Sequence, residues 1–151
     1  MNQKIGFALF LLSTGISSTV YATLGDNVST IENDRAAMSS EPVTTKDNPN
    51  YKIYIIKTDS AIVREYVSKA GIIFSVGWNG NAHPDTKQLL GKYWSEHCEA
   101  LKRHPREPGK RIHKLVSDRL VSKKEGVQGA VRGYAYDPTL VPKGVNVDEI
   151  S

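Results

Sequence analysis

Four histidines and one cysteine are the side chains of this sequence best suited to catalytic or metal chemistry: His83, His97, His104, His113 and Cys98. His97 and His104 are seven residues apart, which on a helix places them on one face about 10 Å from each other. That separation is too large for one metal ion, and the chain lacks the His-x-x-x-His spacing that puts two ligands on adjacent turns. The spacing therefore favours structural or surface histidines, although His83 and His113 could join a composite site.

Cys98 directly follows His97, but adjacent helical residues do not face each other, so a thiol enzyme would need a distant histidine. Cys98 also falls on an apolar stripe, which favours an inert, packed thiol, and a single cysteine excludes an internal disulfide framework. The chain has no G-x-S-x-G elbow and no phosphate-binding P-loop. We predict no catalytic residue, metal ligand or cofactor, and keep an enzyme built on Cys98 or the histidines as the alternative.

The least ordinary feature of the sequence is a basic segment. Residues 102–124 contain nine basic and two acidic side chains, in a chain whose net charge is +4. We predict a binding patch made of five of these residues: Arg103, Arg106, Lys110, Arg111 and Lys114. Such a patch can bind anionic lipid, an acidic protein or nucleic acid, of which nucleic acid is the least favoured for an exported protein. The alternative, which the pattern alone favours, is a solvated loop that protects a sheet edge from pairing.

The elements that must position these residues are indicated by hydrophobic periodicity. Three runs with period-two alternation predict an antiparallel meander with one face on the core; they are residues 51–57, 61–67 and 71–78. Gly71 is suited to the left-handed position of a tight hairpin with a bulge.

The second half of the chain is predicted to contain one main helix and two more strands. Pro84 and Asp85 open the helix, and Gly91 within it indicates a close approach to a strand. Two strand-like runs follow, residues 112–122 and 127–136. The predicted fold is α+β, with an antiparallel sheet of about five strands packed on the main helix. A Ser29–Glu32 capping box adds a short N-terminal helix over about residues 30–39.

The first 22 residues have the layout of a signal peptide. Lys4 precedes an apolar run over residues 5–16, and small residues ending at Ala22 form the predicted cleavage site. The apolar run is about half the ~20 residues that span a bilayer, so an uncleaved anchor is the less favoured alternative. We expect a periplasmic or secreted protein with no transmembrane segment after cleavage, in which residues 23–50 precede one domain over residues 51–151.

Several segments, in their order and spacing, resemble a bacterial family of exported proteins called domain of unknown function 2844. They are ATLGDNVSTIENDRAAM, VREYV, FSVGWNG, PDTKQLLGKY and RGYAYDPTLVPKGVNVDEI. Many members carry a Gly-Gly-His-like turn before the penultimate strand, where this chain has residues 125–128, Glu-Gly-Val-Gln. Any role of that histidine is therefore not carried over to this chain.

The resemblance implies an exported, periplasmic domain with no assigned activity. We expect a non-catalytic binding or interaction module of the cell envelope, whose partner is an anionic envelope component or a protein. A purely structural accessory is the remaining alternative to the enzyme named above.

Overall fold

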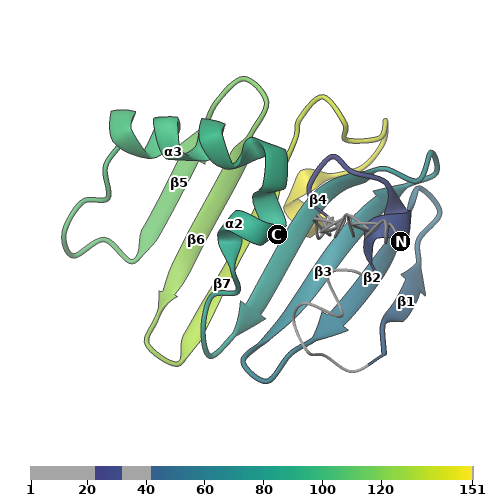
Figure 1. Ribbon diagram of the computed structural model, residues 1–151, viewed down its shortest axis with the longest axis horizontal. Coiled ribbons are helices and arrows are strands. Elements are labelled where there is room, and N and C mark those ends of the chain that lie inside the picture. The colour runs from purple at the N-terminus through teal and green to yellow at the C-terminus, as the bar shows by residue number, and fades with distance from the viewer. Residues whose placement is uncertain (1–22, 32–41, 151) are drawn as a thin grey trace, which may run out of the picture.

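The computed structural model describes residues 23–31 and 42–150 of the chain. Its main feature is one antiparallel sheet of seven strands in the order β1-β2-β3-β4-β7-β6-β5 (Figure 1). The strands are β1 (Thr44–Asp47), β2 (Tyr51–Lys57), β3 (Ala61–Ser68), β4 (Ile73–Gly80), β5 (Ile112–Val116), β6 (Val121–Val127) and β7 (Ala130–Tyr136). The sheet dominates the fold, and β1 and β5 form its two edges.

The prediction of about five strands packed on one main helix is wrong, because the described sheet has seven strands. β1 is short and fully exposed, and its sequence, TTKD, has no apolar alternation to reveal it. The predicted run over residues 112–122 is two strands, because a turn closed by a 2.8 Å hydrogen bond from Ser117 N to Leu120 O separates β5 from β6. Residues 32–41 are not described, so most of the predicted N-terminal helix lies outside the described residues.

The meander of β2, β3 and β4 is confirmed, with Gly71 at φ 78° and a register shift between Tyr66 and Val67. The expectation that only one face of it meets the core is wrong, because the meander is covered on both faces. Alternation along β3 explains this: Val63 and Val67 face one apolar cluster, while Tyr66 faces another.

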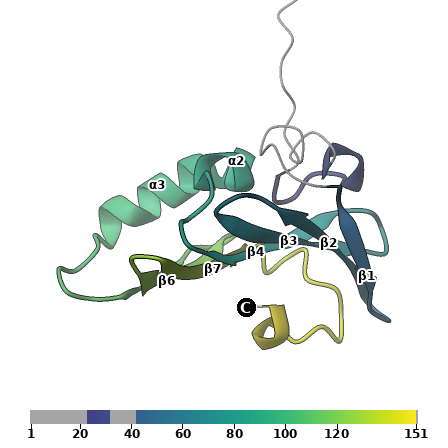
Figure 2. The ribbon, with the colours of Figure 1, turned by 90° about the horizontal axis from the view of Figure 1, so that it is seen from below.

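The helical layer covers the sheet face on which Val63 and Val67 lie (Figures 1 and 2). It consists of α2 (Thr86–Leu90), the 3-10 turn η2 (Gly91–Tyr93) and α3 (Trp94–Arg103). The Asp85 carboxylate caps α2 by accepting hydrogen bonds from the amides of Lys87 and Gln88. Leu89, Leu90 and Tyr93 bury their side chains against the sheet.

The N-terminal segment, residues 23–31, packs beside α2 on the same face. Leu24 N donates to Leu89 O over 3.1 Å. The turn η1 (Val28–Thr30) in this segment is capped by Asn27, whose side chain accepts a hydrogen bond from the amide of Ser29. Glu32, the second residue of the predicted capping box, lies outside the described residues. Gly91 has φ 46°, and a Cβ there would lie 2.5 Å from Thr23 Oγ1, so the close approach expected at Gly91 is to this segment and not to a strand.

The C-terminal segment covers the opposite face of the meander (Figure 2). It ends in the turn η3 (Val147–Ile150), and its buried Ile150 joins Tyr51, Tyr66 and Phe74 in the second apolar cluster. In the described part of the chain this second layer does not extend over β5 and β6 (Figure 2).

Candidate anion-binding site

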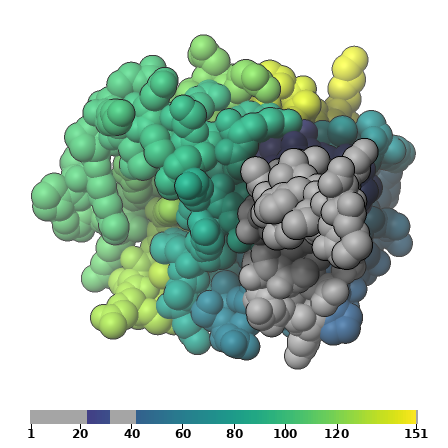
Figure 3. Space-filling model, in the orientation of Figure 1, coloured from purple at the N-terminus to yellow at the C-terminus, as the bar shows by residue number. Residues whose placement is uncertain are grey.

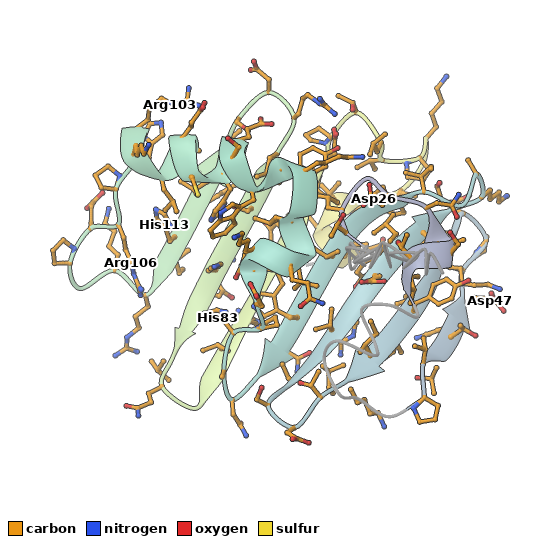
Figure 4. The ribbon with its side chains drawn as sticks, viewed as in Figure 1. Asp26, Asp47, His83, Arg103, Arg106 and His113 are labelled. Carbon is orange, nitrogen blue, oxygen red and sulfur yellow. The ribbon has the colours of Figure 1, made fainter. Side chains whose placement is uncertain are left out.

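The structure divides the five residues of the predicted patch. Arg103 ends α3, while Arg106, Lys110 and Arg111 lie in the exposed loop after it, which protrudes at the left of the molecule (Figures 3 and 4). Lys114 lies on β5, where alternation turns its side chain to the face opposite the helices, since its neighbour Leu115 is buried on the helical side. The patch residues are therefore all exposed but do not form one surface, and their role stays a prediction.

Arg106 lies close enough to Lys124, a lysine outside the predicted patch, for the two positive charges to repel each other. Lys124 lies on β6 opposite His113 of β5, with its side chain on the helical side of the sheet. Its Nζ donates a hydrogen bond to Thr86 Oγ1 at the start of α2 over 2.8 Å. Burial lowers the pKa of Lys124, and the positive charge of Arg106 lowers this pKa further.

His83 lies at the start of the helical layer, near the same two cations. Trp78 Nε1 donates to His83 Nδ1 over 2.8 Å, so the neutral ring carries its proton on Nε2. Burial lowers the pKa of His83, and the charges of Lys124 and Arg106 lower it further. His83 is solvent-exposed, so the Nε2–H group remains available as a donor to a ligand.

His97 lies deeper, between α3 and β6. Its ring stacks on Trp94 with 5.5 Å between centroids, and its Nδ1 is 3.4 Å from Ser122 Oγ. Burial lowers the pKa of His97 to about 4, with further contributions from Lys124 and His113. His113 on β5 contacts the C-terminal end of α3, where its Nε2 lies 3.2 Å from the backbone oxygen of His104.

We call the set of Arg106, Lys124, His83, His97 and His113 the cationic cluster. The pKa shifts in it arise from burial and from other cations, so each positive charge raises the free energy of the others. The attraction of an anion placed near these groups would offset both effects, and ammonium, guanidinium, imidazole N–H and hydroxyl groups are the donors that bind carboxylate or phosphate oxygens. The arrangement is therefore suited to binding an anionic group.

Nucleophilic catalysis finds no matching geometry in the described residues. Cys98 is partly buried and forms no hydrogen bond with a described histidine. Ser122 and His97 approach each other, but both are buried, at 3% and 4% exposure, so a substrate carbonyl cannot reach them. Among the described residues, no three His, Cys, Asp or Glu side chains are placed to hold a metal ion.

Sequence reasoning missed Lys124 and Thr86 for a specific reason. Treating residues 112–122 as one strand gave no register for β6, and without a register Lys123 and Lys124 cannot be assigned to faces. The turn signal Ser117-Asp118 was the available clue to the hairpin.

Comparisons with known proteins extend the description to the family level. A family model described as a protein of unknown function (DUF2844) matches residues 20–150, which confirms the resemblance seen in the sequence motifs. Neither the comparison with curated proteins nor that with solved structures gives a match. None of the helices described is both long and apolar enough to cross a membrane.

Proposed function

This chain belongs to the DUF2844 family, and from that premise we propose that it is an exported, non-catalytic binding module of the cell envelope that recognises an anionic group. The proposal of export, to the periplasm or beyond, rests on the signal-peptide layout of residues 1–22. The proposal of anion binding rests on the cationic cluster.

The observation that carries the binding proposal is the placement of Lys124. Its ammonium group is partly withdrawn from water, with a hydroxyl as its hydrogen-bond partner and the Arg106 guanidinium as its charged neighbour. Burying a charge without a counter-charge is costly, and here the neighbouring charge has the same sign. A carboxylate or phosphate group beside Lys124 and His83 would supply the missing counter-charge, whether it belongs to an envelope polymer, a lipid or a protein.

Titration of the histidines with inorganic phosphate tests this proposal. A bound anion favours the protonated forms, so phosphate should raise the pKa of exposed His83 and, through its charge without direct contact, that of buried His97. Both pKa values are measured from the ring proton signals in NMR spectra. The effect should weaken as salt rises, because salt screens the attraction.

Lys124→Met should remove most of the phosphate-induced shift, whereas Lys57→Met, an exposed lysine on β2, should leave it unchanged. The proposal fails if phosphate leaves both histidine pKa values unchanged in the wild-type protein, or if Lys124→Met responds as the wild type does.

Export has its own test, independent of anion binding. The full chain, expressed in a bacterial host and recovered from the periplasm or the medium, should have the mass of a protein that begins at Thr23. Retention in the cytoplasm with residues 1–22 still attached would refute this part of the proposal.

A further inference from the structure

Besides the cationic cluster, the free edge of β5 is a second feature of the molecule that is suited to binding a partner. Within the described residues β5 pairs with β6 alone. Gly126 N donates to Arg111 O over 3.3 Å, and Ser117 N donates to Leu120 O over 2.8 Å. Hydrogen-bonded pairs alternate along an antiparallel ladder, so the odd-numbered residues of β5 bond to β6. The amide and carbonyl groups of Ile112, Lys114 and Val116 therefore point to the free edge.

The side chains of the same three residues lie on the sheet face that the C-terminal segment leaves uncovered (Figure 2). Ile112 and Val116 are 54% and 59% exposed, and with Val127 at 47% they are the exposed large hydrophobic residues of the described chain. All three lie on β5 and β6, at this one end of the sheet.

The opposite edge of the sheet shows what a protected edge looks like in this protein. β1 has only four residues, Thr-Thr-Lys-Asp, all polar and exposed. Short, charged edge strands are a common defence against pairing with other chains. β5 carries one such charge, Lys114, but this lysine lies between two exposed apolar side chains, and its edge-facing backbone groups pair with no described strand.

The charges along β5 indicate which kind of strand the edge accepts. Lys114 lies between Ile112 and Val116, Lys110 and Arg111 precede them, and the strand IHKLV contains no acidic residue. A second copy in the antiparallel register that pairs all three edge residues would set two Lys114 side chains opposite each other, and like charges in that position destabilise a pair. A strand with an acidic residue opposite Lys114 has the complementary charge.

We propose that the β5 edge binds an extended segment of a partner protein as an eighth strand, in which two apolar residues flank an acidic one. The main-chain groups of Ile112, Lys114 and Val116 supply the ladder, and the flanking apolar side chains cover Ile112 and Val116, as in other strand-addition complexes. A shallow cleft of about 650 Å³, lined in part by Ile112, Val127 and Arg132, adjoins the Ile112 end and extends the surface. The cationic cluster is on the helical side of the sheet, so this inference does not rest on the proposed function.

Hydrogen exchange with a synthetic peptide tests the proposal on the intact protein. The peptide acetyl-Ser-Val-Thr-Asp-Thr-Val-Ser-amide has the required alternation. At saturating peptide the amides of Ile112, Lys114 and Val116 should exchange at least tenfold more slowly, while those of His113 and Leu115, already bonded to β6, should change little. The proposal is overturned if the peptide slows no exchange at all, or if it slows exchange elsewhere but not at the amides of Ile112, Lys114 and Val116.

Two variants at one position separate the backbone contribution from that of charge. Lys114→Pro removes an edge amide without removing a β5–β6 hydrogen bond, and proline is tolerated on edge strands. It should abolish peptide binding, whereas Lys114→Thr, which keeps the amide, should bind with a several-fold weaker affinity. Equal affinity of Lys114→Pro and Lys114→Thr would overturn the proposal. If Lys114→Pro fails to fold, the same peptide with N-methylated valines provides the test, and it must not bind to the wild-type protein.

Three further measurements identify the partner that occupies the β5 edge. Replacing the aspartate of the peptide by lysine should weaken binding, and Lys114→Glu should reverse this preference. Protection of the edge amides that grows with protein concentration in the absence of peptide would show a second copy on β5 and overturn the assignment to a partner protein. Lys124→Met should still bind the peptide, which distinguishes failure at this edge from failure of the anion site.

Discussion

Tyr93→Phe tests how the helical layer is joined to the end of β7. The Tyr93 hydroxyl donates to Asp137 Oδ2 over 2.5 Å, and both residues are buried. Thr139 donates from its amide and its hydroxyl to the other oxygen, Asp137 Oδ1. Without the phenol, Oδ2 keeps only the Arg119 guanidinium at 3.9 Å among the described residues. The substitution removes no carbon atom, so it tests this hydrogen bond without creating a cavity.

A hydrogen bond to a charged, buried acceptor contributes about 1.5–3 kcal/mol, and we expect Tyr93→Phe to lower the free energy of unfolding by about 2 kcal/mol at pH 7. In a domain of this size that loss corresponds to a fall in Tm of roughly 5–10 °C. Urea and thermal unfolding followed by circular dichroism measure both quantities.

The pH dependence of the loss identifies its cause. Burial alone would raise the pKa of Asp137, but hydrogen bonds from Thr139 and Tyr93 hold this pKa below its usual value of 3.8. A lowered carboxyl pKa contributes stability above pH 3.8, which is lost as pH falls through the folded-state pKa. Tyr93→Phe raises that pKa, so the difference from wild type should be full at pH 7 and shrink below about pH 4.

Tyr134→Phe is the matched control, because the Tyr134 ring stacks on Tyr136 and its hydroxyl has no hydrogen bond to a described residue. It should change stability by less than about 0.5 kcal/mol. Equal losses in Tyr93→Phe and Tyr134→Phe, or a Tyr93→Phe loss that is the same at pH 3 and pH 7, would refute the reasoning.

Two further perturbations test packing and titration within the helical layer. Gly91→Ala should destabilise the protein by more than about 2 kcal/mol, because φ is 46° and the new Cβ would clash with Thr23, while Gly109→Ala, with φ 82° and open space around it, should cost about 1 kcal/mol in the same unfolding assay. Because burial lowers the pKa of His97 to about 4, the folded protein loses stability as pH falls from 6.5 towards 4. His97→Gln should therefore flatten the dependence of Tm on pH in that window, and an unchanged slope would contradict the assignment.

Local patterns predicted the elements that local forces form. The meander of β2 to β4 followed from period-two alternation and Gly71, and the start of α2 from Asp85. β1 could not be predicted in this way, because its polar residues become a strand only through pairing with β2.

The candidate site was predictable only in part, for a related reason. Arg106 was visible in the sequence as part of a basic segment, but its neighbours Lys124 and His83 come from β6 and from the chain before α2. Their proximity depends on long-range pairing, which composition and spacing do not encode.

The sequence by itself determined the family, the hairpins between residues 51 and 80, and the concentration of positive charge in residues 102–124. Only the tertiary structure decided on which face of the sheet each of these basic side chains lies. β7 pairs with β4 and thereby sets β6 and β5 beside the meander, which turns Lys124 towards the helices and Lys114 towards the open face. The physical reason is that side chains alternate between faces, so a residue's surroundings are undefined until the register of its strand is set by partners distant in the chain.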